Sequence, residues 1–168
     1  MGNPATYQPR VAMWSQRDPR WYYKKLGTSG CRMGPKGCAV TCLSIIILRW
    51  YWDIHKHNPS KIWRPGDVCD WMSANGRFNP QGYAYLNTVD TLTGGKCINV
   101  WQPDGARYTM VRVVWGGLDH WVVKLDGDLC LDPWDKTIKY LAQPKWNVTP
   151  DTINGIPQTS NRKWFKLI

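Results

Sequence analysis

The chain has 168 residues, a length that suits one domain with a sizeable buried core. Its 43% hydrophobic and 20% charged residues exclude a disordered protein, and no apolar run approaches the roughly 18 residues that a membrane span needs. A net charge of +10 favours a polyanionic partner such as nucleic acid, anionic lipid or an anionic cell wall. The basic residues are scattered and form no nucleic-acid motif, so we do not expect nucleic acid to be that partner.

The N-terminal stretch is polar and contains Pro4 and Pro9, which predicts a short arm, residues 1–13, ahead of a single domain, residues 14–168. It has no apolar segment of signal-peptide length, so we expect synthesis in the cytoplasm and release by some other means. The chain has six cysteines but no C-x-x-C pair, which disfavours a zinc site. Without a signal peptide, we expect most or all of them to be reduced thiols.

A glycine-rich loop, residues 27–37, leads into the strongest predicted helix, which runs from Cys38 to about residue 52. This helix is apolar nearly all round and should be buried. Cys38 stands at its first position, where the unpaired N–H groups and the positive end of the helix dipole favour a thiolate. Because the thiolate is the nucleophilic form, Cys38 is a candidate nucleophile. The alternative is that Cys38 is a small buried hydrophobe under a tight turn.

The remaining elements change in character along the chain. Asp67 is the predicted N-cap of a helix that ends at residues 75–76, and residues 83–92 predict another helix. After Lys96 the hydrophobic period becomes two, which predicts strands. Helices followed by strands indicate an α+β fold with an antiparallel sheet. Residues 142–162, with three prolines, predict a long surface excursion. The predicted strands are 98–101, 108–115, 121–125 and 129–131, with 137–141 and 164–168 as further candidates.

A cysteine nucleophile needs a base, and the chain has three histidines. His55 and His57 lie at the far end of the predicted helix, more than about 20 Å from Cys38 at about 1.5 Å per residue. They are also two residues apart, so they do not share a helix face and we expect no metal site there. His120, at the head of a predicted strand, is the remaining candidate base, although a lone histidine at a strand end can equally be structural.

The turn at residues 126–127 predicts a hairpin that brings His120 and Asp132 to the same end. A two-residue turn would point Asp132 away from the face that carries His120. A three-residue loop with Gly127 in the left-handed region would put both side chains on one face. The catalytic interpretation therefore predicts an odd-length loop, with Asp132 orienting the imidazole. The weaker candidates for that role are Asp119 and Asp135.

Five segments stand in this order along the chain: WSQRDPRW (14–21), KLGTSG (25–30), GCAVT (37–41), HWVV (120–123) and DPW (132–134). Together they resemble the papain-like bacteriocin-processing cysteine peptidases, and most closely their relatives in phage and bacterial cell-wall lysins. The resemblance spans residues 14–134 and implies a papain-like fold, in which an N-terminal nucleophile helix packs on a C-terminal antiparallel sheet. It implies Cys38 as nucleophile, His120 as base, Asp132 as orienter and Gln16 as oxyanion donor beside the backbone N–H of Cys38.

The chain also departs from that family. Cys42 stands where such sequences usually have serine, and Cys31 is an additional thiol in the loop. Residues 59–96 and the chain after Trp146 carry no motif of the family. None of these departures removes one of the four implied site residues.

The resemblance implies a cysteine peptidase without metal or cofactor that hydrolyses peptides of the bacterial cell wall. The setting would be phage lysis or injection, with action at the cell envelope after release or as part of a virion. One alternative is a peptidase that processes leader peptides or other proteins. The other is a catalytically inactive papain-fold module that binds an anionic wall polymer, a nucleic acid or a protein, and whose binding would survive the Cys38→Ala substitution.

Overall fold

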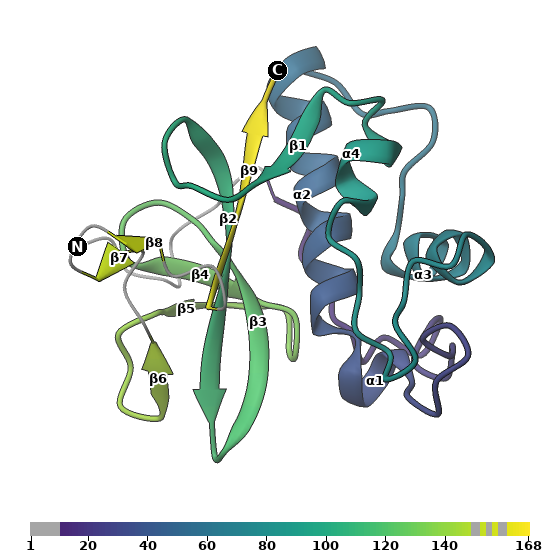
Figure 1. The fold of residues 1–168 in the computed structure, drawn as a ribbon, viewed down its shortest axis with the longest axis horizontal. Helices are drawn as coiled ribbons and strands as arrows, with labels where there is room; N and C mark the ends of the chain where they lie inside the picture. Colours follow the sequence, from purple (N-terminus) through teal and green to yellow (C-terminus); the bar gives the residue numbers. More distant parts are fainter. Residues whose placement is uncertain (1–10, 149–151, 154–155, 158–160) are drawn as a thin grey trace.

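The computed structural model describes residues 11–148, 152–153, 156–157 and 161–168. Figure 1 shows the helices gathered on one side of the molecule and the strands on the other. The helices are α1 (Met33–Lys36), α2 (Cys38–His55), α3 (Pro65–Ala74) and α4 (Thr88–Leu92). The strands are β1 (Cys97–Val100), β2 (Ala106–Trp115), β3 (Leu118–Lys124), β4 (Leu129–Asp132), β5 (Thr137–Tyr140), β6 (Trp146–Val148), β7 (Thr152–Ile153), β8 (Ile156–Pro157) and β9 (Arg162–Leu167).

The long helix α2 is the centre of the fold, as its apolar sequence predicts. Every residue from Val40 to Leu48 is buried, because α2 contacts β3 of the sheet as well as the smaller helices α3 and α4. The helix begins at Cys38, as expected, and ends at His55, three residues beyond the predicted end. Its C-cap, Lys56, adopts a left-handed φ of 61°. Within the described residues, no helix combines the length and apolarity needed to cross a bilayer.

The predicted α+β class with an antiparallel sheet is confirmed. Among the described residues, seven strands form one sheet in the order β1-β9-β2-β3-β4-β5, with β6 paired to the last residues of β2. Every pairing in this sheet is antiparallel. A first core of buried side chains fills the space between α2 and the sheet, and a second, smaller one includes Val113, Val122 and Cys130.

Two predicted helices differ from the structure. Helix α3 begins at Pro65 with Arg64 as its N-cap, so the prediction of Asp67 as N-cap is wrong. Asp67 is instead the third helical residue, and its carboxylate accepts the backbone N–H of Arg64 at 3.1 Å. Of residues 83–92, only Thr88–Leu92 are helical, because the Asn79 side chain accepts the N–H groups of residues 81 and 83 in a turn.

The predicted surface excursion over residues 142–162 is wrong for Trp146–Val148, which form β6 and pair with β2. Part of that stretch, and residues 1–10 of the predicted arm, lie outside the described residues. Val11, from the same predicted arm, is buried in the core. Short α1 lies inside the region predicted as loop, immediately before Cys38.

Candidate active site

Cys38 opens α2 and is half-buried, at one side of a groove of about 390 Å³. The turn before it needs a glycine, because a Cβ on Gly37 would lie 2.5 Å from the carbonyl oxygen of Met33. The backbone N–H of Gly37 donates to that same carbonyl at 2.7 Å, so Gly37 is the only residue between the end of α1 and the start of α2. The thiol therefore lies at a helix N-terminus, where the N–H groups of the first turn have no intrahelical partner.

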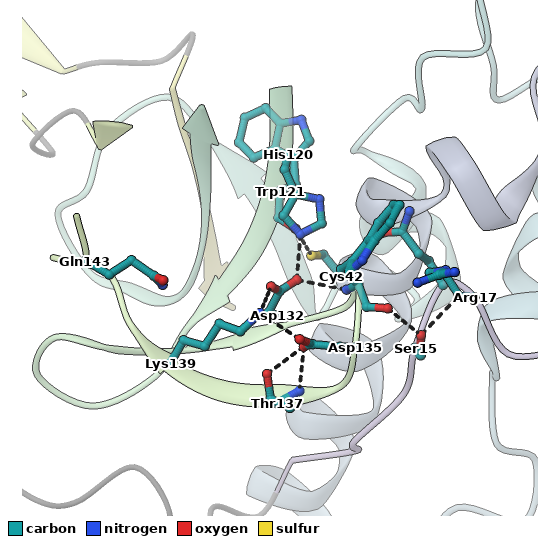
Figure 2. Close-up of polar contacts among 12 residues, drawn as sticks. Ser15, Arg17, Cys42, His120, Trp121, Asp132, Asp135, Thr137, Lys139 and Gln143 are labelled. Atoms are coloured by element: carbon teal, nitrogen blue, oxygen red, sulfur yellow. Dashed lines mark hydrogen bonds and ion pairs between the residues drawn. The ribbon is translucent and has the colours of Figure 1, made fainter. Parts of the chain in front are cut away.

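His120 and Asp132 project from the same face of the β3–β4 hairpin. The register pairs Val123 with Leu131, and the N–H of Leu125 donates to Leu129 at 2.8 Å. The hairpin loop is therefore three residues long, 126–128, with Gly127 at φ 60°. This confirms the predicted odd-length loop. The His120 Nε2–H donates to Asp132 Oδ1 at 2.6 Å, as Figure 2 shows.

The imidazole of His120 lies between the thiol and the carboxylate. Burial alone would lower the pKa of His120, but hydrogen bonds with Asp132 and with the Cys38 side chain outweigh it and raise the pKa to about 9. Because Nε2 faces Asp132, Nδ1 is the ring nitrogen left for Cys38. The geometry therefore favours a protonated imidazole at neutral pH, bonded to the Asp132 carboxylate.

Asp132 is almost completely enclosed, with 3% of its side chain exposed. Burial would raise the pKa of Asp132, but the contact with His120, an ion pair with Lys139 and the backbone N–H of Trp134 lower it overall. The N–H of Trp134 donates to Oδ1 at 2.8 Å, and Lys139 Nζ donates to Oδ2 at 2.5 Å. The carboxylate is thus held ionised and in one orientation.

Lys139 is the site residue that the sequence analysis missed. It lies on β5, where Thr137 is the register partner of Asp132, so Lys139 is two residues further along the same face. Its ammonium group also contacts Asp135 at 2.8 Å, as Figure 2 shows. Of the alternative orienters, Asp135 binds Lys139 and Thr137, and Asp119 pairs with Arg112 at 2.5 Å. Once the β4–β5 register is known, the alternation along β5 identifies Lys139.

Gln16 links the two halves of the site. It is 1% exposed, and its backbone N–H donates to Pro133 at 2.7 Å, next to Asp132. Its side-chain Nε2 donates one N–H to the carbonyl of Gly34 at 2.9 Å, in the segment just before Cys38. The amide nitrogen has a second N–H to offer, as an oxyanion donor requires. Its Oε1 is buried and has no hydrogen-bond partner among the described residues.

Trp134 covers the His120–Asp132 pair. Its ring lies edge-on to the His120 ring at 6.5 Å and to the Trp115 ring at 6.3 Å, while the guanidinium of Arg17 lies 4.7 Å above it. The Ser15 hydroxyl donates to the Trp134 carbonyl at 2.9 Å. These contacts shield the pair from water, which strengthens the charge interactions inside it.

The other thiols differ from Cys38. All six cysteines are free, and burial is the main cause that raises the pKa of Cys42, Cys69, Cys97 and Cys130, with Cys69 at about 11 and Cys97 at about 12. Buried thiols of this kind are unreactive at neutral pH. Cys31 is half-buried in the same groove as Cys38, but its thiol faces the carbonyl of Gln81 at 3.6 Å.

His55 and His57 lie near the end of α2 opposite Cys38, exposed, with their rings against Tyr51. Over the described part of the chain, no three histidine, cysteine or acidic side chains gather into a metal site.

Comparison with protein-family models, with curated proteins and with solved structures gives no match to this chain. The functional interpretation therefore depends on the geometry of Cys38, His120 and Asp132, and on the resemblance of the sequence segments around them.

Proposed function

We propose that this chain is a papain-like cysteine peptidase that cleaves peptides of the bacterial cell wall. The observation that carries the proposal is the position of His120, which bonds Asp132 on one side and Cys38 on the other with its pKa raised to about 9. An imidazole held between a half-exposed thiol and a buried carboxylate is the arrangement that activates a cysteine for attack on a carbonyl.

In this mechanism the Cys38 thiolate attacks the carbonyl carbon of the scissile peptide bond. The backbone N–H of Cys38 and the Gln16 amide stabilise the oxyanion, and one such donor is typically worth about 10²- to 10³-fold in rate. The imidazolium of His120 protonates the leaving amine, which leaves a thioester on Cys38. His120 then removes a proton from water, which hydrolyses the thioester and regenerates the thiolate.

The proposed substrate and setting follow from the charge of the chain and from the resemblance of its segments. The net charge of +10 suits an anionic wall, and the sequence segments resemble those of phage and bacterial lysins. On this proposal the protein acts at the cell envelope after release from the cytoplasm or as part of a virion.

The nucleophile is tested by labelling the native protein with iodoacetamide from about pH 5 to pH 8, followed by mass spectrometry of each cysteine. We expect Cys38 to label fast at the acidic end, and slowly in the His120→Ala variant. Cys31 is the internal control, because it is half-exposed in the same groove without a histidine. A Cys38 that labels no faster than Cys31 would contradict the proposal.

The substrate is tested with purified cell walls, by measuring the release of new amino groups. Wild type should release them and the Cys38→Ala variant should not, although both should bind the wall. Equal binding by both proteins with no release by either would favour the inactive binding module instead.

A further inference from the structure

The groove beside Cys38 carries an unbalanced positive charge. Its lining includes one basic and one acidic residue, Lys36 and Asp119. Asp119 is neutralised by Arg112 at 2.5 Å. The ammonium group of Lys36 has no hydrogen-bond or ion-pair partner among the described residues. No acidic residue of the groove lining is therefore left to balance the positive charge of Lys36.

The position of Lys36 relative to the nucleophile is fixed by the main chain. Lys36 is the last residue of α1, and its N–H donates to Arg32 at 3.0 Å. Only Gly37 separates it from Cys38, in a turn where a Cβ would clash with Met33. A basic residue at the C-terminal end of a long helix can be explained by the helix dipole, but α1 has a single turn and its dipole is too weak to explain Lys36. Lys36 is therefore presented at the groove, two residues from the thiol.

The rest of the groove offers apolar and aromatic contact. Tyr83 and Leu118, both among its lining residues, are 72% and 66% exposed, and Trp121 is half-buried there. A peptide lying in this groove would place its apolar side chains or methylenes against these residues. An anionic group on that peptide could pair with the ammonium group of Lys36.

We propose that Lys36 makes the groove selective for a peptide that carries a carboxylate close to the scissile bond. This inference rests on the proposed function, since it takes Cys38 as the nucleophile. Because the lysine is exposed, the preference should be modest, roughly two- to fivefold over the matched neutral peptide. Screening of exposed charges by salt should weaken it further.

The first test compares two alkylating reagents of similar size, anionic iodoacetate and neutral iodoacetamide, at Cys38. We expect the iodoacetate-to-iodoacetamide rate ratio to fall roughly two- to fivefold in Lys36→Gln, further in Lys36→Glu, and little in Lys36→Arg. The charge on His120 is the same in all of these proteins, so it cancels in the comparison. Lys61→Gln is the matched control, because Lys61 lies over the Trp63 ring and does not line this groove.

The second test uses pairs of peptides that differ only as glutamate or glutamine next to the bond that wild type cleaves. The kcat/KM advantage of the glutamate peptide should disappear in Lys36→Gln, chiefly through KM. If Cys38 labels rapidly but the reagent ratio is unchanged in Lys36→Gln, only the inference about Lys36 is overturned. If neither reagent labels Cys38, the proposed nucleophile is wrong and the inference falls with it.

Discussion

At the scale of single residues, Asp132 does more than orient an imidazole. One oxygen accepts from His120 and from the backbone of Trp134, and the other accepts from Lys139. A buried carboxylate without such partners would take up a proton and could no longer hold an imidazolium. Lys139 is therefore a positioning residue, acting on His120 only through Asp132.

Replacing Lys139 by methionine should raise the pH at which His120 loses its proton. The ammonium group stabilises the deprotonated Asp132–His120 pair, so without it the pKa of His120 should rise above about 9. We expect the alkaline limit of peptidase activity to move to higher pH in Lys139→Met and to stay in place in Lys139→Arg. Asp135→Asn is the control, since it removes the second partner of Lys139 but leaves Asp132 paired. An unchanged pH profile in Lys139→Met would exclude this role.

Gln16 can be separated from the nucleophile by experiment. Gln16→Ala should reduce kcat by about 10²- to 10³-fold, because one oxyanion donor is lost. Iodoacetamide labelling of Cys38 should change little, since alkylation forms no oxyanion. A parallel loss of labelling would mean that Gln16 acts by supporting the fold through its bond to Gly34.

At the scale of elements, the β3–β4 hairpin determines that His120 and Asp132 share one face. Its three-residue loop places Gly127 at φ 60°, a conformation that costs an ordinary L-residue roughly 1–2 kcal/mol. Gly127→Ala should therefore lower the free energy of unfolding by about 1 kcal/mol, and Gly127→Asn by less, because asparagine tolerates this region.

Urea unfolding of both variants measures that difference. Labelling of Cys38 should persist in each of them, since the loop length and hence the face that carries His120 and Asp132 are kept. Loss of rapid labelling in Gly127→Asn would show that the loop affects the site by more than its length.

Much of this arrangement could be predicted from the sequence because it depends on local patterns. The apolar run predicts α2, and the period-two alternation predicts the main strands. The turn at Gly127, together with the need for one face, predicts the register of the His120–Asp132 pair. The predictions failed where a side chain competed with the helix pattern, as Asn79 does, or where proline at the first helical position moved the start of α3.

Lys139 could not be assigned for a different reason. Its role depends on which strand lies beside β4 and in what register, and the spacing along the chain contains neither. The charge balance of the groove is likewise a tertiary property, because the Arg112–Asp119 pair joins two strands across the sheet.

At the scale of the whole molecule, the charged site couples folding to pH. The folded-state pKa of His120, about 9, lies above its ordinary value of 6.5, so protonation of His120 stabilises the fold. That contribution, on the order of 3 kcal/mol, should be fully present below about pH 6.5 and lost as the pH rises through about 9. Asp132 has a lowered pKa, so its contribution is present above its ordinary value of 3.8 and is lost as the pH falls.

Thermal unfolding of wild type and His120→Gln between about pH 6 and pH 9.5 measures this coupling. The Tm advantage of wild type should shrink as the pH rises through this range. An advantage that is constant with pH would mean that His120 stabilises by packing alone.

The site is divided between two parts of the chain: Gln16 and Cys38 precede Gly94 and Gly95, and His120, Asp132 and Lys139 follow them. Both glycines are exposed, have positive φ and lie between α4 and β1, with nothing near their Cβ positions. Two fragments expressed separately, residues 1–94 and residues 95–168, would each contain only part of the proposed catalytic set. On the proposed function neither fragment alone would cleave a peptide, and cleavage would appear only when the two reassociate, so a chain cut between these glycines could serve as a reporter of proximity between two fused proteins.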